Sequence, residues 1–298
     1  MTVVNRKIVP FLWFDKVSDK AVNFYLSAFP SSSLRSVTTL SETPSGAVEI
    51  YAVDLLDGEF HLMSAGPEFK FTPAISFLVA CGSAAEVDHL WQKLVPGGSV
   101  LIELGSTPFS ERYGWLQDPF GLSWQMMCTA QQPIPQQIIP FLMFTGAQFY
   151  RAEEAIQFYT SVFPNSAVEE IQRYQEGEEP NQPGSVRFAE FRLHGQLFAA
   201  MDSYYDHGFS FNEAISFVVN CETQEEIDYY WEKLSADPEA EMCGWLKDRF
   251  GVSWQIVPTV MYEMQQTNDA NRLARVTEAF LKMKKFDIAA LQKAYEGS

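Results

Sequence analysis

The chain contains 298 residues, a length typical of two domains of ordinary size. Its 47% hydrophobic and 14% aromatic residues are enough to fill sizeable cores, which argues against disorder. With 38 acidic residues against 21 basic ones the formal charge is −17, so the protein repels phosphate backbones and anionic lipids. These values argue against nucleic acid and against a membrane surface as partners.

The cysteines and the N-terminus indicate the compartment. Cys81, Cys128, Cys221 and Cys243 show no C-x-x-C spacing, which disfavours a disulfide scaffold and a zinc ribbon. Residues 1–14 lack the apolar stretch and cleavage site of a secretory signal, and no run reaches the roughly 18 apolar residues of a membrane span. We therefore expect a reduced, cytoplasmic protein.

The first elements alternate between strand and helix patterns. Ile8–Phe14 is a short apolar run, as expected of a buried strand. Apolar residues at helical spacing follow in Ala21–Ser32, and Pro30 ends that helix. Val48–Leu56 and Glu59–Ser64 flank an Asp-Gly turn and predict a hairpin.

A second unit of the same kind comes next. The strand Ile75–Cys81 runs into a capping box formed by Ser83 and Glu86. In the following helix Trp91 lies on the apolar stripe, so we expect it to pack on a sheet. The stretch Gly114–Gln125, GWLQDPFGLSWQ, predicts two strands around a turn that Asp118 caps.

The chain then repeats these elements. Gly244–Gln255, GWLKDRFGVSWQ, agrees with Gly114–Gln125 at nine of twelve positions, and Asp248 takes the place of Asp118. Ile138–Phe144, Ala155–Ser166 and Ile215–Cys221 likewise match the earlier strand, helix and strand. The offset between the copies falls from 140 at Trp91 and Trp231 to 130 at Gly114 and Gly244, so the first copy has an insertion of about ten residues.

This repetition predicts an α+β protein of two tandem domains, each made of two βαβββ modules. The domains span residues 1–130 and 131–259, with a short linker at 129–137. Residues 260–298 are not repeated and form a helical C-terminal appendix, in which Asn268–Lys285 and Asp287–Tyr295 have helical patterns. Asp269 and Asp287 are the expected caps.

These motifs resemble a known superfamily. Paired βαβββ modules, an FYxxxFP helix and the closing GWLKDRFGVSWQIVP strand pair are similar to the vicinal oxygen chelate superfamily, which includes glyoxalases, bleomycin-resistance proteins and dioxygenases. Within it the chain resembles the PhnB-like branch, commonly labelled 3-demethylubiquinone-9 3-methyltransferase. The resemblance implies that the two modules of each domain enclose a cup, which in catalytic members holds a divalent metal.

Carried over by position, that resemblance implies no metal here. The last-strand glutamate of the superfamily falls on Gln125 and Gln255, which are weak, neutral ligands. The other ligand positions fall on apolar residues in both copies, at Val9, Ile139, Ala74 and Ala214. The histidines His61, His89, His194 and His207 do not repeat between copies. We therefore expect neither a metal nor another cofactor.

The resemblance places aromatic side chains around each cup. In the first copy the expected lining is Trp13, Phe14, Trp115, Trp124 and Gln125, and in the second it is Phe144, Trp245, Trp254 and Gln255. Neighbouring strand residues point to opposite faces, so only one of Trp124 and Gln125 can enter, and the resemblance favours the glutamine. The candidate ligand-binding residues are Trp13, Trp115, Gln125, Trp245, Gln255 and Cys243, and no catalytic residue is assigned.

Three hypotheses for function follow. The leading one is a metal-free protein that binds an unidentified small molecule; the others are a metal-dependent lyase, isomerase or dioxygenase, and an interaction protein with collapsed cups. Methyl transfer is disfavoured because the sequence has no G-x-G motif. Asp202, Asp206 and His207 form an acid–base cluster or, as the simpler alternative, a solvated loop. A homodimer is one option for assembly.

Overall fold

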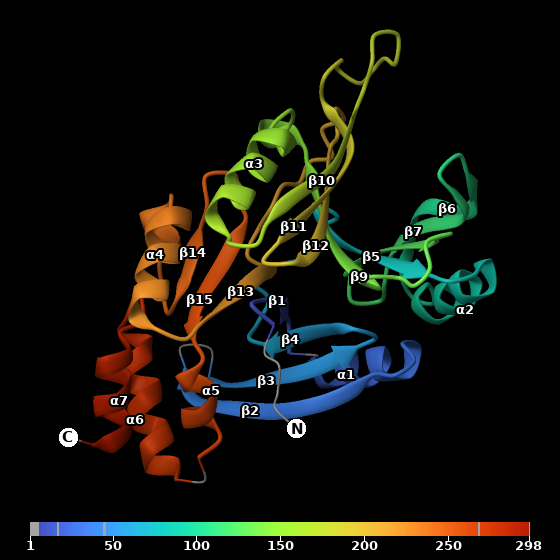
Figure 1. Ribbon diagram of the computed structural model, residues 1–298. Coiled ribbons are helices and arrows are strands. Elements are labelled where there is room, and N and C mark those ends of the chain that lie inside the picture. The colour runs from blue at the N-terminus through green and yellow to red at the C-terminus, as the bar shows by residue number, and fades with distance from the viewer. Residues whose placement is uncertain (1–5, 17, 44–45, 268, 298) are drawn as a thin grey trace.

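The structure is a computed structural model that describes residues 6–16, 18–43, 46–267 and 269–297 (Figure 1). The first repeat contains two βαβββ modules. The first module comprises β1 (Ile8–Phe14), α1 (Ser18–Ala28), β2 (Ser33–Thr43), β3 (Gly46–Leu55) and β4 (Gly58–Ser64). The second comprises β5 (Ile75–Cys81), α2 (Ala84–Leu94), β6 (Ser99–Thr107), β7 (Ser110–Gln117) and β8 (Ser123–Cys128).

The second repeat departs from this plan near its end. Its first module comprises β9 (Ile138–Phe144), the 3₁₀ turn η1 (Gly146–Gln148), α3 (Ala152–Val162), β10 (Ala167–Arg173), β11 (Val186–Leu193) and β12 (Gln196–Asp202). The last module comprises β13 (Ile215–Cys221), α4 (Gln224–Leu234), the 3₁₀ turn η2 (Pro238–Ala240), β14 (Trp245–Lys247) and β15 (Ser253–Pro258). Residues 235–244 form no counterpart of β6, so the predicted insertion in the first copy is this strand and the loops around it.

The strands form two sheets, and each sheet combines modules from different repeats. The seven-stranded sheet has the order β14-β15-β13-β1-β4-β3-β2, and the eight-stranded sheet has the order β10-β11-β12-β9-β5-β8-β7-β6. Strand β1 pairs antiparallel with β13, and β5 pairs antiparallel with β9. The expectation that each cup forms within one repeat is therefore wrong. Strand β5 already carries β8 on one edge, and the short linker after β8 places β9 at its free edge.

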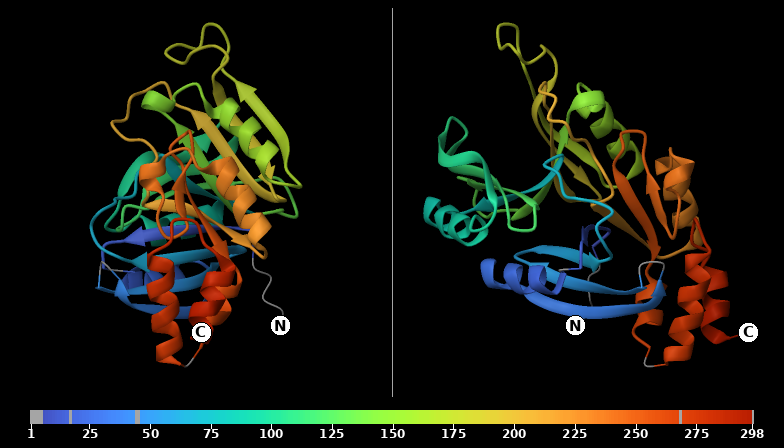
Figure 2. Two further views of the ribbon diagram at one scale, coloured as in Figure 1. Left: turned by 90° about the vertical axis from the view of Figure 1, so that its left-hand side faces the viewer. Right: turned by 180° about the vertical axis from the view of Figure 1, so that it is seen from behind.

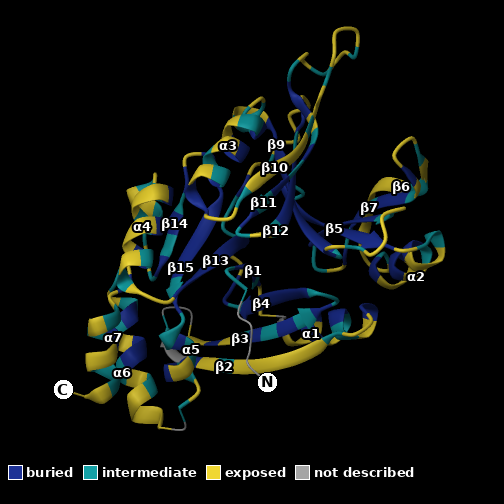
Figure 3. Cartoon of the chain, viewed as in Figure 1, coloured by how far each residue is buried: buried dark blue, intermediate teal, exposed yellow. Residues whose placement is uncertain are grey.

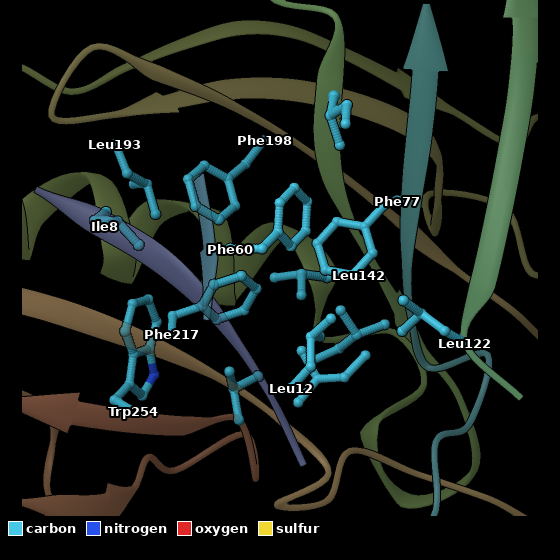
Figure 4. Close-up of a cluster of buried hydrophobic side chains, with 14 of the residues drawn as sticks. Ile8, Leu12, Phe60, Phe77, Leu122, Leu142, Leu193, Phe198, Phe217 and Trp254 are labelled. Atoms are coloured by element: carbon cyan, nitrogen blue, oxygen red, sulfur yellow. The ribbon is translucent and has the colours of Figure 1, made fainter. Parts of the chain in front are cut away.

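Strand alternation divides the side chains between a shared core and an opposite face of each sheet. On β1, Ile8, Leu12 and Phe14 enter the core, whereas Phe11 and Trp13 point to the other face. Figure 4 shows the core, where Phe60 and Phe77 of one repeat lie near Phe198 and Phe217 of the other.

The same alternation corrects part of the predicted lining. The core contains Trp124, Trp254, Phe14 and Phe144, so none of these residues lines a cup. Their neighbours along each strand point to the opposite face of the sheet. The choice of Gln125 over Trp124 is confirmed in this respect.

Each repeat also holds its own two modules together through a buried carboxylate. The Tyr25 hydroxyl donates to Asp118 Oδ2 at 2.7 Å, and Trp124 Nε1 donates to the same oxygen at 2.9 Å. The backbone N–H groups of Phe120 and Leu122 donate to Oδ1 at 2.9 and 3.1 Å, so the predicted turn cap is confirmed. Burial raises the pKa of the Asp118 carboxyl, and these hydrogen bonds oppose the rise.

The second repeat has the same network. Tyr159 and Trp254 donate to Asp248 Oδ2 at 2.7 and 2.8 Å, and the backbone of Phe250 and Val252 donates to Oδ1. The two turns are thus equivalent in both sequence and structure.

The helix caps follow the sequence. Ser83 and Thr223 accept from the backbone N–H of Glu86 and Glu226, and the predicted stripe places Trp91 in the core. The described helices are too short and too polar to cross a membrane.

The C-terminal appendix comprises α5 (Val260–Gln265), α6 (Ala270–Leu281) and α7 (Ile288–Glu296). The predicted caps Asp269 and Asp287 are confirmed, although α5 was not predicted and position 268, where the first helix was expected to begin, lies outside the described residues.

The appendix lies against the last module and the far end of β2 (Figures 1 and 2). The backbone N–H groups of Cys243 and Gly244 donate to the carbonyls of Met283 and Lys284 at 2.8 and 2.7 Å. The appendix thereby supplies backbone acceptors beside β14, where the first repeat has β6. Figure 3 shows exposed and buried residues alternating along α6 and α7, with β2 beside them largely exposed and β15 buried.

Candidate ligand pocket

Each sheet has one face turned away from the shared core, and these two faces are the cups of the molecule. Cup A is the face of the seven-stranded sheet that carries Phe11, Trp13 and Gln255. Cup B is the corresponding face of the eight-stranded sheet, which carries Phe141, Tyr113 and Gln125. Each cup joins the first module of one repeat to the second module of the other.

Cup A contains a pocket of about 480 Å³. Strands of both modules form its floor, and the C-terminal appendix closes one side with apolar side chains. The residues that the appendix contributes are Met261, Tyr262, Gln265, Phe280, Leu281 and Phe286. A pocket of this volume with mostly apolar walls is typical of small-molecule sites.

Aromatic side chains form one wall of this pocket. Trp13 Nε1 donates to the carbonyl of Gly66 at 2.8 Å, which fixes the orientation of the indole. The rings of Trp13 and Trp245 meet edge to face with centroids 6.2 Å apart, and Phe11 meets Trp245 in the same way at 5.9 Å.

Gln255 presents an unpartnered carbonyl oxygen to the pocket. Its side-chain Nε2 donates to Ser216 Oγ at 2.9 Å, and the residue is only 6% exposed. None of the described residues donates a hydrogen bond to Gln255 Oε1. A side-chain acceptor without a protein donor can accept a hydrogen bond from a molecule in the pocket beside it.

The equivalent glutamine in cup B is fully satisfied. Gln125 Nε2 donates to Ser76 Oγ at 2.9 Å, and its Oε1 accepts from the Tyr113 hydroxyl at 2.7 Å. Tyr113 is buried, and burial raises the pKa of its phenol. Position 113 corresponds to Cys243 in the second repeat, which removes the partner of Gln255.

Side chains of cup B are larger at several equivalent positions. Phe188 stands where cup A has Ile50, Glu190 where it has Ala52, and Leu78 where it has Val218. Leu78, Tyr113, Ile139, Phe141, Leu197 and Ala199 form a buried cluster on this face. Larger side chains therefore occupy these positions of cup B.

The tryptophans of the two cups also differ in their partners. Trp115 Nε1 donates to Ser123 Oγ at 2.7 Å in cup B. In cup A the equivalent Ser253 Oγ is buried and has no partner among the described residues, and Trp245 packs on Phe11 and Trp13 instead.

A charged group at one end of cup A was not singled out from the sequence as a site. Glu59 and His61 lie on β4, and both are buried. Glu59 Oε1 is 3.4 Å from His61 Nε2, and its Oε2 is 2.8 Å from Arg35 Nη1. Burial raises the pKa of Glu59, but His61 and Arg35 outweigh it and the net pKa is lowered. In the sequence, this charged group is indicated by alternate residues that follow the predicted hairpin turn and point to one face, namely Glu59, His61 and Met63.

The donor set of cup A does not fit a divalent metal. The superfamily position on β1 is the apolar Val9, Gln255 is neutral, and the one histidine lining the pocket, His61, already contacts Glu59. Within the described ranges, no three His, Cys, Asp or Glu side chains are grouped as a metal site requires.

The predicted ligand-binding residues divide between the two cups. Trp13, Trp245, Gln255 and Cys243 line the pocket of cup A, whereas Trp115 and Gln125 lie in cup B. The predicted grouping of Trp13 with Trp115 and Gln125 is wrong, because the modules pair across the repeats. A role for any of these residues in binding stays a prediction. Burial raises the pKa of the Cys243 thiol, which makes it a weak nucleophile.

The aromatic loop of the second repeat, residues 202–211, is held by hydrogen bonds of its polar side chains. Asp202 is buried and accepts from the backbone N–H groups of Ala152 and Val186 at 3.2 and 2.8 Å. His207 bonds Ser203 Oγ at 2.8 Å, and Asp206 accepts from the backbone of Gly208. Both carboxylates thus serve as backbone acceptors.

Comparison with known proteins identifies the family. The family described as 3-demethylubiquinone-9 3-methyltransferase matches the chain twice, over residues 6–127 and 136–257. The chain belongs to this family. The two matches also coincide with the two repeats, and the fold is that of the vicinal oxygen chelate superfamily.

The chain is also similar to several solved structures. Glyoxalase I from Zea mays is 12% identical with a TM-score of 0.56, covers 87% of this chain and is itself covered over 94%, which shows a shared fold. A putative 3-demethylubiquinone-9 3-methyltransferase, PhnB protein, from Bacillus cereus is 35% identical over 42% of this chain and all of its own length, with a TM-score of 0.39. A putative dioxygenase from Bacillus subtilis is 11% identical over 96% of this chain and 94% of its own, with a TM-score of 0.48. A search of curated proteins finds no match.

Proposed function

We propose that this member of the family binds a small, largely apolar molecule in the pocket of cup A, and does so without a metal ion. The observation that carries the proposal is the combination of a pocket of about 480 Å³ with the unpartnered carbonyl of Gln255 on its wall. Ligand pockets usually pair an apolar lining with a few placed polar groups.

The contrast with cup B supports this function. Both glutamines descend from one repeated motif, yet only Gln255 lacks a donor among the described residues. An acceptor that has no protein donor and faces a pocket favours a ligand that supplies the donor. In this proposal cup B, where Tyr113 already donates to Gln125, has a structural role.

The chemistry named in the family description finds no support in this sequence. A Gly-rich loop between a strand and a helix is the usual cradle for the methyl donor, and the chain has no G-x-G. The proposal is therefore one of binding, with no reaction assigned.

A thermal-shift screen with planar apolar compounds tests the proposal. The unfolding midpoint of the wild type should rise with the concentration of at least one compound, by the equivalent of about 2.7 kcal/mol at a hundredfold excess over Kd. Ile50→Phe introduces the side chain that cup B has at this position, so it should narrow the pocket and abolish the rise.

Phe188→Ile is the matched control, because it changes the same position in cup B and should leave the response intact. A response that survives Ile50→Phe unchanged would place the ligand elsewhere, and the lack of any response across the panel would contradict the proposal.

A further inference from the structure

We infer that the ligand of cup A is a hydroxyaromatic molecule whose neutral phenolic hydroxyl donates a hydrogen bond to Gln255 Oε1. This inference rests on the proposed function and names the class of ligand. The observations behind it are the internal duplication and the exchange of Tyr113 for Cys243 between the two cups.

Cup B shows which group donates to this glutamine when the protein itself supplies the donor. The phenol ring of Tyr113 lies on the cup face among Leu78, Ile139 and Phe141, and its hydroxyl donates to Gln125 Oε1 at 2.7 Å. The residue is 7% exposed, so the ring and the hydroxyl are both removed from water. Tyr113 is thus a phenol that the chain itself supplies to the side chain of Gln125.

Cup A keeps the acceptor and lacks the phenol. Gln255 is oriented by Ser216 as Gln125 is by Ser76, because the glutamine Nε2 donates to the serine Oγ at 2.9 Å in each cup. The equivalent residue, Cys243, has a small side chain whose Sγ lies 3.9 Å from the carbonyl of Leu281. The ring and the hydroxyl that fill cup B are thus both replaced by open pocket.

The walls of the pocket suit an aromatic ring. Phe11, Trp13 and Trp245 already meet edge to face, a geometry that a further ring can extend. The volume of about 480 Å³ exceeds that of one phenol, so the ligand has room for ring substituents or a second ring.

The charges favour a neutral hydroxyl over a carboxylate. Glu239 lines the pocket, Glu213 lines it while paired with Lys247 at 2.6 Å, and the whole chain carries a formal charge of −17. These charges disfavour an anionic ligand, and an apolar wall disfavours ionisation of a bound phenol. The phenol therefore keeps the proton that it donates to Gln255.

Calorimetric titration of the full chain with 2-naphthol and 2-methoxynaphthalene tests the inference. The two probes share a ring system, but only the first can donate a hydrogen bond. The wild type should bind 2-naphthol about 10- to 100-fold more tightly, because the methoxy compound leaves Gln255 Oε1 unpaired. Gln255→Leu should remove this preference, and Gln125→Leu should keep it, since that glutamine is already partnered inside cup B.

The outcomes separate the inference from the proposed function. Equal affinities for the two probes, with both affinities lost in Ile50→Phe, would show that the phenolic hydroxyl is not recognised. This result would overturn the inference and leave the proposal of binding in cup A intact. A preference that persists in Gln255→Leu would also overturn it. Binding of neither probe, with other apolar compounds still bound, would overturn it too. Because the comparison of the two probes uses the wild type, the inference is tested even if a variant fails to fold.

Discussion

Cup A and cup B are built from equivalent strands of one repeated sequence, yet Tyr113 donates to the glutamine of cup B and the glutamine of cup A faces a pocket. In cup B, Phe188, Leu78 and Tyr113 occupy positions where cup A has Ile50, Val218 and Cys243. In cup A, the appendix covers one side and leaves space between itself and the sheet. The comparison supports our proposal that the duplicated scaffold keeps cup B for stability and uses cup A for a ligand.

The loss of a β6 counterpart in the last module accounts for part of the difference. Strand β6 pairs with β7 in the first repeat and continues the sheet. In the second repeat the chain turns at Cys243, whose φ is 51°, and residues of the appendix bond the backbone there. A helical segment contributes side chains such as Phe280 and Phe286 over the cup, where a strand would extend its edge.

The largest effects should come from the features that the two halves share. Asp118→Ala and Asp248→Ala each remove the acceptor of two side-chain and two backbone donors in the core. Each should lower the free energy of unfolding by about 3–5 kcal/mol, because buried donors lose their partner. Urea unfolding measures this value, and a near-neutral result for either variant would contradict the equivalence of the two turns.

Tyr113→Ala should convert cup B into a second site. The variant should cost about 3–5 kcal/mol, since it leaves a cavity and an unpaired Gln125. Titration with 2-naphthol should then give two sites per chain where the wild type gives one. Tyr113→Phe is the control, because it keeps the ring and should bind no second molecule.

Gly244 and Gly114 occupy equivalent sequence positions, but Gly244 packs against the appendix and Gly114 packs against its own repeat. A Cβ at Gly244 would lie 2.4 Å from the ring of Phe286, and one at Gly114 would lie 2.5 Å from the ring of Trp91. Gly114→Ala should be destabilised by about 1–3 kcal/mol. Gly244→Ala should be destabilised by more, because Gly244 also has a φ of 83°. Only Gly244→Ala should also weaken binding in cup A, because Phe286 lines that pocket. Equal loss of binding in both variants would show that the appendix has no specific part in the site.

The smallest expected effect concerns acid stability. The net pKa of Glu59 is lowered, so its contribution to stability is present above its unfolded value of 4.5 and is lost as the pH falls through the folded value. The double variant Glu59→Leu with His61→Ala copies cup B at both positions, where Leu197 and Ala199 stand. Its unfolding free energy should fall less than that of the wild type below pH 4.5. Parallel pH profiles would contradict the role given to Glu59.

Much of this fold could be predicted from local patterns. The hairpin at Asp57, the turn caps Asp118 and Asp248, and the capping boxes at Ser83 and Thr223 all depend on neighbouring residues, and the structure confirms them. The pairing of modules across repeats could not be predicted in this way. It depends on which free strand edge β9 and β13 meet, and no spacing in the sequence records that choice.

The candidate site was predicted in part for the same reason. Alternation correctly placed Gln125 and Trp124 on opposite faces, but the cup that each residue enters follows from the pairing of the modules. The contribution of the appendix to cup A could not be predicted either, since Phe280 and Phe286 have no counterpart in the first repeat. The exchange of Tyr113 for Cys243 is visible in the sequence. Its consequence for Gln255 depends on the hydrogen bond from Tyr113 to Gln125, which only the structure shows.

A crystal structure of the full chain with 4-bromophenol tests the central claim most directly, because anomalous scattering locates the bromine. The account predicts one bromine site per chain, inside cup A, with the phenol oxygen within hydrogen-bond distance of Gln255 Oε1. Bromine in cup B, or in cup A with its hydroxyl turned away from Gln255, would contradict it.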